Sequence, residues 1–228
     1  MDERALLRQM LAAQQAVDTP QTFAMSGREW DVLPGVYAPM FTRAAEFFAG
    51  ALPYPRGGAF LEIGSGTGVI AVTAALSGCA RVTATDISPE AAANTAMNAR
   101  RHGADAVTTV CGDMFAPLAD GDRYDLVFWN SSSLPTSQAW PETEGLGRAI
   151  TDPGYRFHDA YLAGAADHLT PDGRLMLGFS NVGDRAHLDR LADRHGWTIR
   201  ALDRGEVVFP GRSGSFDLLE LTRRTPAG

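Results

Sequence analysis

The chain has 228 residues, of which 45% are hydrophobic and 21% charged, as is typical of one globular domain with a buried core. The net charge of −7 argues against nucleic acid or an anionic membrane as a partner, because the average field repels both. All 20 basic residues are arginine, which excludes mechanisms that need a Schiff-base or P-loop lysine. No apolar run is long enough to span a membrane, and no signal peptide is evident, so we expect a cytoplasmic protein. Cys79 and Cys111 lack CxxC spacing and are expected to be small buried residues.

The first 55 residues are expected to form a separate N-terminal segment. Residues 1–18 have the pattern of an amphipathic helix, and Thr22–Met25 with Glu29–Val32 can form a small hairpin. We therefore expect residues 1–55 to be an N-terminal helix and lid segment over a domain that covers residues 56–228.

From Gly58 onward, short runs rich in β-branched residues alternate with longer helical stretches. This alternation predicts an α/β domain, a largely parallel sheet with helices on both faces. The predicted strands are Ala59–Ile63, Arg81–Thr85, Val107–Cys111, Tyr124–Trp129 and Arg174–Ser180. The predicted helices are 68–78, 89–102, 155–169 and 184–195. Ser88 before Pro89 is the pattern of a helix N-cap.

The last part of the chain predicts a different connection. Trp197–Phe209 and Ser215–Leu221 are two extended runs without a helix between them, so they should pair as an antiparallel hairpin. Residues 131–154 are rich in proline and glycine and have no sustained periodicity. Because long structureless loops in compact domains are usually functional, we expect this loop to face a ligand.

A glycine-rich turn follows the first predicted strand of the domain. The run Leu61-Glu62-Ile63-Gly64-Ser65-Gly66-Thr67-Gly68 places glycines where an open α/β sheet binds ligands, at the carboxyl end of a strand. The spacing is G-x-G-x-G, and position 69 is a valine. This spacing counts against a dinucleotide-binding enzyme, whose fingerprint is G-x-G-x-x-G.

Polar residues follow the ends of the next strands. Asp86 ends the second strand and is suited to accept hydrogen bonds from ribose hydroxyls, while Ile87 can cover a purine ring. Asp113 follows the third strand and can accept from an adenine amino group, and Asn130 ends the fourth. Since these ends share one edge of a parallel sheet, the residues should form one site.

The runs LEIGSGTG, ATDIS, CGDMF and YDLVFWN resemble the ordered motifs of the class I S-adenosylmethionine-dependent methyltransferases over residues 58–222. The resemblance implies a Rossmann-like, seven-stranded sheet with an antiparallel last strand, the cofactor S-adenosylmethionine, and no metal ligands. It also implies that the glycine loop borders the methionine part of the cofactor, that Glu62 lies near its amino group, and that Asp113 and the Met114 backbone hold the adenine. The implied cofactor-binding residues are Glu62, Gly64, Ser65, Gly66, Thr67, Gly68, Asp86, Ile87, Asp113, Met114 and Asn130.

A narrower resemblance concerns the segment Asp31–Pro39 and the end of the fourth strand. Both are similar to the glutamine-N5 methyltransferases that act on release factors, which carry Asn-Pro-Pro-Tyr after that strand. Here the motif reads Asn130-Ser131-Ser132-Ser133-Leu134-Pro135, so the asparagine remains and the rigid prolines and the aromatic are absent. The resemblance makes Asn130 the expected catalytic residue, because its side-chain oxygen would orient the acceptor.

The serines in place of prolines favour a flexible, polar acceptor site. A guanidinium of Arg148 or Arg156 could clamp a carboxylate, aromatic rings could wall the site, and His158 could remove a proton. The candidate substrate-binding residues are Tyr37, Ser131, Ser132, Trp140, Arg148, Arg156 and His158.

The sequence thus predicts a methyltransferase that modifies a nitrogen, or less readily an oxygen, of a small polar metabolite. Its arginine-only, alanine-rich composition suggests bacterial specialised metabolism. The expected partner is a small molecule, with neither nucleic acid nor membrane, and the oligomeric state is open. Two alternatives remain: a protein glutamine N5-methyltransferase, and an inactive S-adenosylmethionine-binding protein.

Overall fold

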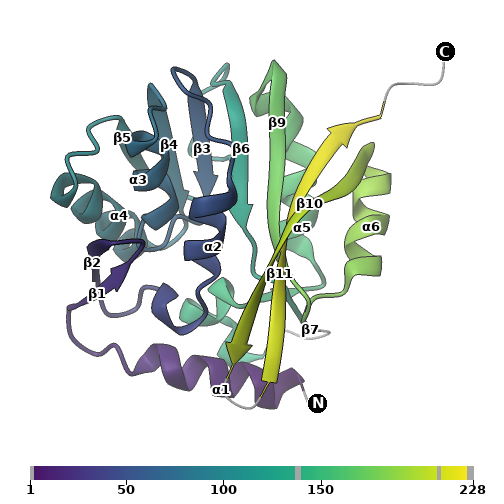
Figure 1. Cartoon of the computed structure of the whole chain (residues 1–228). Helices are drawn as coiled ribbons and strands as arrows, with labels where there is room; N and C mark the ends of the chain where they lie inside the picture. Colours follow the sequence, from purple (N-terminus) through teal and green to yellow (C-terminus); the bar gives the residue numbers. More distant parts are fainter. Residues whose placement is uncertain (1–2, 137–139, 210–211, 225–228) are drawn as a thin grey trace.

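The computed structural model describes residues 3–136, 140–209 and 212–224. At its centre is a seven-stranded sheet with the order β10-β11-β9-β6-β3-β4-β5 (Figure 1). Strand β11 runs antiparallel to both of its neighbours, and the other pairs are parallel. The predicted α/β, Rossmann-like sheet with an antiparallel C-terminal hairpin is therefore confirmed. The strands are β3 (Ala59–Ile63), β4 (Arg81–Asp86), β5 (Val107–Cys111), β6 (Tyr124–Asn130), β9 (Leu169–Ser180), β10 (Trp197–Phe209) and β11 (Arg212–Arg223).

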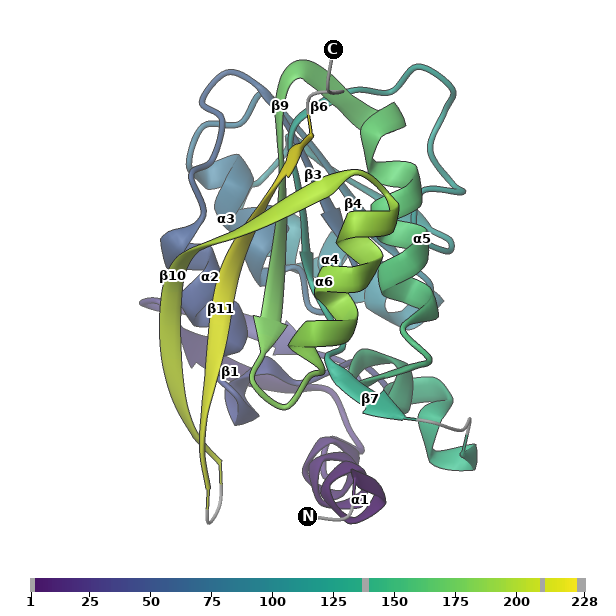
Figure 2. The same cartoon turned by 90° about the vertical axis from the view of Figure 1, so that its right-hand side faces the viewer.

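Helices cover both faces of this sheet, as Figure 2 shows. One apolar core joins β3 and β6 to α2 (Ala44–Ala51), α3 (Val69–Leu76) and α4 (Pro89–Arg101). A second core joins the opposite face to α5 (Arg156–Gly164) and α6 (Arg185–Arg194). Because the central strands are buried on both sides, they are continuous hydrophobic runs in the sequence.

The ends of the helices follow their local sequence. The Ser88 side chain accepts a hydrogen bond from the Ala91 N–H, so α4 begins at Pro89 as predicted. Gly78 and Gly103 have positive φ values of 98° and 62° just after α3 and α4, where a left-handed residue ends a helix most easily.

The N-terminal segment comprises α1 (Glu3–Gln15) and the antiparallel pair β1 (Gln21–Met25) and β2 (Arg28–Val32). The β1–β2 hairpin packs on α4, while α1 lies across the carboxyl edge of the sheet (Figure 1). No helix in the described part of the chain has the length and apolar character needed to cross a bilayer.

Several sequence expectations were wrong. The loop 131–154 contains a parallel pair, β7 (Leu134–Thr136) and β8 (Thr151–Pro153), and two 3-10 helices, η2 (Pro141–Thr143) and η3 (Gly145–Ala149). These elements are too short for a periodic pattern to reveal them. The helix predicted over 155–169 ends at Gly164 and continues as the 3-10 helix η4 (Ala165–His168). A further 3-10 helix, η1 (Pro39–Phe41), and α2 were not predicted.

The two cysteines lie in different environments. Cys79 is buried as expected, whereas Cys111 is exposed because it ends the edge strand β5.

Candidate active site

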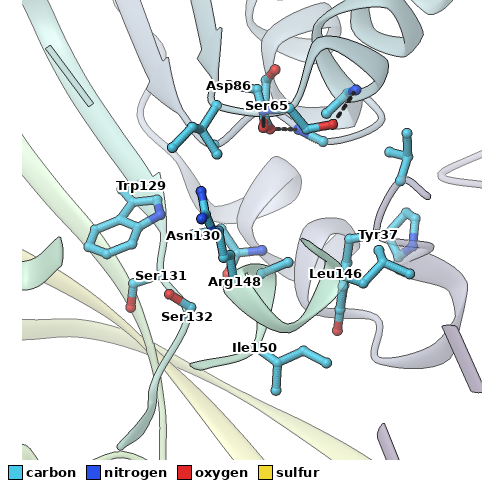
Figure 3. A pocket seen from close by; sticks show the side chains of 18 of the residues that line it. Tyr37, Ser65, Asp86, Trp129, Asn130, Ser131, Ser132, Leu146, Arg148 and Ile150 are labelled. Carbon is cyan, nitrogen blue, oxygen red and sulfur yellow. Dashed lines mark hydrogen bonds between the residues drawn. The ribbon is translucent and has the colours of Figure 1, made fainter. Parts of the chain in front are cut away.

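A cavity of about 840 Å³ lies at the carboxyl ends of β3, β4 and β6. Figure 3 shows Ser65 and Asp86 on one side of this cavity and Ser132 and Ile150 on the other, with Asn130 between them. The cavity therefore has two parts, which we name the cofactor half and the acceptor half. The sequence-predicted residues that line it are Tyr37, Glu62, Gly64, Ser65, Gly66, Thr67, Asp86, Ile87, Asp113, Met114, Asn130, Ser131, Ser132 and Arg148.

The glycine loop turns sharply between β3 and α3. Gly64 and Gly66 have φ values of 66° and 55°, and a Cβ added at Gly66 would point into open space. Their backbone is thus accessible to a ligand. Gly68 is not part of the cavity wall, because it packs against α4, where an added Cβ would lie 2.8 Å from a Thr95 methyl carbon. Position 68 therefore requires a glycine, because a larger side chain would clash with α4.

Glu62 lies at the floor of the cofactor half. The residue is 2% exposed, and its Oε2 has no hydrogen-bond partner within the described part of the chain. Burial raises the pKa of this carboxyl well above its usual value, and the charge of Asp86 adds to the shift. The Ala71 backbone donates to this carboxyl, but Oε2 stays without a partner, and a buried carboxylate oxygen without one is costly. The site is therefore suited to a cation such as the ammonium of an amino acid.

Asp86 ends β4 and braces the glycine loop. Its Oδ2 accepts from the Gly66 N–H at 2.9 Å, and its Oδ1 accepts from the Ser88 N–H at 2.9 Å. Burial raises its pKa, which these backbone hydrogen bonds partly offset. Each carboxylate oxygen retains a lone pair for a ligand hydroxyl. The side chain of Ile87 is 41% exposed and forms part of the wall next to it.

Asp113 and Met114 extend the cofactor half beyond β5. Met114 has a φ of 46°, which is unusual for a residue other than glycine and is often found at a binding site. Asp113 also lines a smaller cavity of about 340 Å³ with Arg148 and Arg156. Arg156 stacks on the Phe157 ring and does not line the acceptor half, so it is placed near the far end of the cofactor half.

The acceptor half begins at Asn130, the last residue of β6. The three serines that follow are held in place. The Ser131 N–H and hydroxyl both donate to the Gly178 carbonyl, at 3.0 and 2.7 Å. The Ser133 hydroxyl donates to the Ser131 carbonyl and accepts from the Ser180 N–H. The expectation of a flexible serine segment was therefore wrong, because hydrogen bonds replace the rigidity of prolines.

Helix α1 covers the acceptor half. Leu6, Met10 and Leu11 line the cavity from this helix. Burial raises the pKa of Tyr37, which also lines the cavity, while its hydrogen bond to Thr42 acts in the opposite direction. The substrate-binding role predicted for Trp140 finds no support, because its side chain packs in the apolar cluster under α1 outside the cavity wall.

His158 does not line the cavity, but it contacts a residue that does. Its ring is completely buried, Nδ1 lies 2.7 Å from Asp152 Oδ2, and Nε2 lies 3.1 Å from Ser131 Oγ. The sequence reading gave no role to Asp152, which lies six residues before the histidine. Thr95 and Asn98 of α4 were also missed, although the spacing of polar residues among its alanines was a signal. The Thr95 hydroxyl donates to the Gly66 carbonyl, and Asn98 Nδ2 donates to the Thr67 carbonyl.

Three comparisons with known proteins agree with this geometry. A family model described as a methyltransferase domain matches residues 60–150. The chain is 35% identical over 159 residues to the release factor glutamine methyltransferase of Geobacter sulfurreducens, covering 66% of this chain and 55% of that protein. It is 37% identical over 185 residues to that of Bordetella pertussis, covering 73% and 67%. The chain thus spans between about half and two thirds of these relatives.

Among solved structures, the 16S rRNA N2 G1207 methyltransferase of T. thermophilus in complex with AdoMet and guanosine has a TM-score of 0.61. It is 18% identical and covers 90% of this chain and 50% of that chain, which shows a common fold. These comparisons overturn the expectation of a small-molecule partner without nucleic acid. The relatives are named for a protein acceptor, and proteins of the same fold act on RNA. The net charge of the chain did not predict the class of partner, because it describes the average surface and not the site.

The Glu62 Oε2, which has no partner among the described residues, and the open glycine backbone suit the sulfonium cofactor with which proteins of this fold are crystallised. The relatives that are 35% and 37% identical align with the chain over 159 and 185 residues, which is longer than the family-model match over residues 60–150. The chain therefore belongs to the S-adenosylmethionine-dependent methyltransferases, and its sequence is similar to those of release factor glutamine methyltransferases.

Proposed function

We propose that this protein methylates the side-chain nitrogen of a glutamine in a protein of the release factor class. The observation that carries the proposal is the position of Asn130, at the junction of the cofactor half and the acceptor half. The relatives named for this reaction are 35% and 37% identical to the chain and cover 66% and 73% of it, which supports the same reaction class. The rigid serine turn after Asn130 supports the same acceptor, since it replaces the prolines without loosening the site.

The cofactor half provides a complementary group for each part of S-adenosylmethionine. Glu62 would pair with the ammonium, and the Gly64–Gly66 backbone would border the methionine part. Asp86 would hold the ribose, Ile87 would cover the adenine ring, and Asp113 and Met114 would hold its edge. When bound, the cofactor supplies an electrophilic methyl group on a sulfonium. The protein's contribution is then to position a nucleophile and exclude water.

Asn130 would orient the acceptor. Its amide oxygen accepts an N–H of the glutamine side chain and aims the nitrogen at the methyl group. Ser132 and Tyr37 wall the acceptor half, and Leu6 and Met10 of α1 close it against water. We propose that, within the N-terminal segment 1–55, α1 acts as the lid and moves to admit the acceptor loop of a protein.

The test is methyl transfer from labelled S-adenosylmethionine to a purified bacterial release factor, with mass spectrometry of its peptides. We expect a gain of one methyl group on a single glutamine, and far less transfer when that glutamine is replaced by asparagine. Free glutamine at the same concentration serves as the matched acceptor control. Binding of S-adenosylmethionine without transfer to the release factor would refute the proposal and favour a protein without transfer activity on this acceptor.

A further inference from the structure

Three side chains form a continuous hydrogen-bonded line behind the acceptor half. We name Asp152, His158 and Ser131 the Asp–His–Ser line. Asp152 and His158 are completely buried, whereas Ser131 lines the cavity next to Asn130 (Figure 3). The distances are 2.7 Å from Asp152 Oδ2 to His158 Nδ1 and 3.1 Å from His158 Nε2 to Ser131 Oγ. The line therefore leads from the protein interior to the wall that the acceptor faces.

Backbone groups hold Asp152 in its orientation. The Phe157 N–H donates to both carboxylate oxygens at 3.0 and 3.1 Å, and the His158 N–H donates to Oδ2 at 2.9 Å. These donors belong to the first turn of α5, whose dipole stabilises negative charge. An ionised carboxylate can only accept hydrogen bonds, so His158 carries its hydrogen on Nδ1 and turns the lone pair of Nε2 toward Ser131.

Ser131 can pass a proton without backbone movement. Its hydroxyl donates to the Gly178 carbonyl at 2.7 Å, and rotation of this hydroxyl turns the hydrogen toward His158 Nε2. Meanwhile the Ser131 N–H keeps its own hydrogen bond to Gly178 at 3.0 Å. Unlike a proline at the same position, the serine thus joins the cavity to a buried base.

We propose that Ser131 and His158 take up the proton that the acceptor nitrogen releases on methylation, with Asp152 positioning His158. The inference rests on the proposed function, since it needs an N–H acceptor at Asn130. As the nitrogen–methyl bond forms, the electron pair of the broken methyl–sulfur bond stays on sulfur. The acceptor N–H proton passes to Ser131 Oγ, the Ser131 hydroxyl proton passes to Nε2, and the N–H electron pair stays on nitrogen. The product amide is then neutral, and the imidazolium lies against the Asp152 carboxylate.

The protonation state of His158 agrees with this role. Burial lowers the pKa of its imidazole below the ordinary value of 6.5, and this effect exceeds the opposing effect of Asp152. His187 of α6 also lowers it, and the Tyr155 ring packs at 4.7 Å between ring centres. The imidazole is consequently neutral at pH 7, as a proton acceptor must be.

A direct test uses the whole protein labelled with ¹⁵N-histidine. Long-range ¹H–¹⁵N spectra at pH 7 should show His158 as the neutral Nδ1–H tautomer, and Ser131→Ala should shift the Nε2 resonance. This readout needs neither cofactor nor acceptor. A hydrogen on Nε2 at pH 7 would overturn the proposal, because the nitrogen facing Ser131 could not accept a proton.

Kinetics on the release factor test the same line by a second route. Loss of general-base help typically costs about 100-fold or more, so kcat of Ser131→Ala and Asp152→Asn should fall by about that factor. Ser131→Thr, which keeps a hydroxyl, should recover part of the rate. His168→Gln removes a histidine that stacks on Phe115 away from the site, and its kcat should match that of the wild type. Thermal melts confirm that each variant is folded.

The pH profile separates proton transfer from a structural effect. The wild-type kcat should have an acid limb that lies at lower pH than an ordinary histidine would give, because burial lowers the pKa of His158. On that limb kcat should fall about tenfold per pH unit, and Ser131→Ala should lack the limb. An unchanged kcat, or a reduced kcat that keeps the acid limb, would contradict the proposal. If the wild-type protein does not methylate the release factor at all, the proposed function fails, and the tautomer of His158 decides the Asp–His–Ser line alone.

Discussion

At the scale of single residues, Glu62 is a buried carboxyl group that lines the cofactor half. Its ionised form costs folding free energy because Oε2 has no hydrogen-bond partner among the described residues, and a bound ammonium would recover that cost. We expect Glu62→Gln to raise the melting temperature of the ligand-free protein by roughly 2–4 °C per kcal/mol recovered. It should also weaken S-adenosylmethionine binding by about 10- to 100-fold, as for a lost charged hydrogen bond. Calorimetric titration and thermal melts measure the two effects.

The stability difference between Glu62→Gln and the wild type should depend on pH in one direction. Because the folded-state pKa of Glu62 is raised above its usual 4.5, the penalty is absent below that value and grows as pH rises toward the folded-state pKa. The stability gained by Glu62→Gln should therefore be largest at neutral pH and shrink as pH falls toward 4.5. A gain that is constant with pH would show that the carboxylate charge is not its cause.

Asn130 should affect turnover rather than cofactor binding. Asn130→Ala removes the amide that orients the acceptor, and misplaced reacting groups typically lose about 100-fold in rate. Single-turnover transfer at saturating cofactor measures this loss. S-adenosylmethionine affinity should change by less than about threefold, because Glu62 and Asp86 remain. A transfer rate near that of the wild type would mean that another group aligns the acceptor.

At the scale of elements, α4 holds both the N-terminal hairpin and the glycine loop. Asn98 accepts from the Asp31 N–H at 2.9 Å and donates to the Asp31 and Thr67 carbonyls, each at 2.8 Å. The side chain is completely buried. Removing it takes away the partner of the Asp31 N–H and of the Thr67 carbonyl, while Asn94 still donates to the Asp31 carbonyl. Asn98→Ala should therefore cost roughly 2–3 kcal/mol. That loss corresponds to a fall in melting temperature of roughly 4–12 °C.

Arg100→Ala provides the matched control for Asn98, since it changes an exposed residue of the same helix. Its melting temperature should stay within about 2 °C of the wild type, as for most surface substitutions. Equal melting temperatures for the two variants would show that the asparagine does not brace the hairpin.

Helix α1 is attached to the domain by ion pairs, by a small apolar cluster, and by the buried Gln14 side chain, which exchanges two hydrogen bonds with the Ala38 backbone. Glu142 forms ion pairs with both Arg4 and Arg8, whose guanidinium nitrogens lie 3.0 and 2.9 Å from its Oε1. Because partly exposed ion pairs contribute little to stability, Glu142→Gln should raise hydrogen exchange in α1 by at most about fivefold. Mass spectrometry of deuterated peptides measures this change. Glu46→Gln, which removes a surface pair with Arg43, should leave α1 unaffected.

Acceptor binding provides a second test of α1 as a lid. Exchange in α1 should slow when S-adenosylmethionine and the release factor are both present, and change less with cofactor alone. Identical exchange in the free and ternary states would show that α1 does not close over the acceptor.

At the scale of the whole molecule, the wall of the cavity is formed by segments from both the N-terminal and the C-terminal parts of the chain. Its wall runs from Leu6 of α1 to Phe216 of β11, so a ligand there should stabilise the protein as one unit. At 100 times its dissociation constant, S-adenosylmethionine should add about 2.7 kcal/mol. The melting temperature should then rise by roughly 5–10 °C. NAD at the same concentration should produce no shift, because position 69 is Val69 and the G-x-G-x-x-G fingerprint is absent.

Local patterns were sufficient to predict most of the sheet. The strand Val107–Cys111 and the start of α4 at Pro89 follow from β-branched runs and an N-cap, which act over a few residues. The cofactor half could also be predicted, since parallel strand ends meet at one edge of a sheet. By contrast, α2 and the pair β7–β8 could not be predicted. No side chain caps the start of α2, and the strands β7 and β8 have only three residues each.

The sequence by itself determined the fold class and which strand-end residues line the cavity, Asn130 among them, because both depend on strand ends whose order in the sheet follows from the chain. Only the tertiary structure decided what lies around Asn130. Asp152 and Ser131 reach opposite nitrogens of His158 because β8, β6 and α5 pack together, and no periodicity in sequence records that contact. Likewise, the rigidity of the three serines depends on the Gly178 carbonyl and the Ser180 N–H of β9, an adjacent strand about 47 residues away. Hydrogen bonds between distant segments, rather than residue types, therefore decide how this protein presents its acceptor.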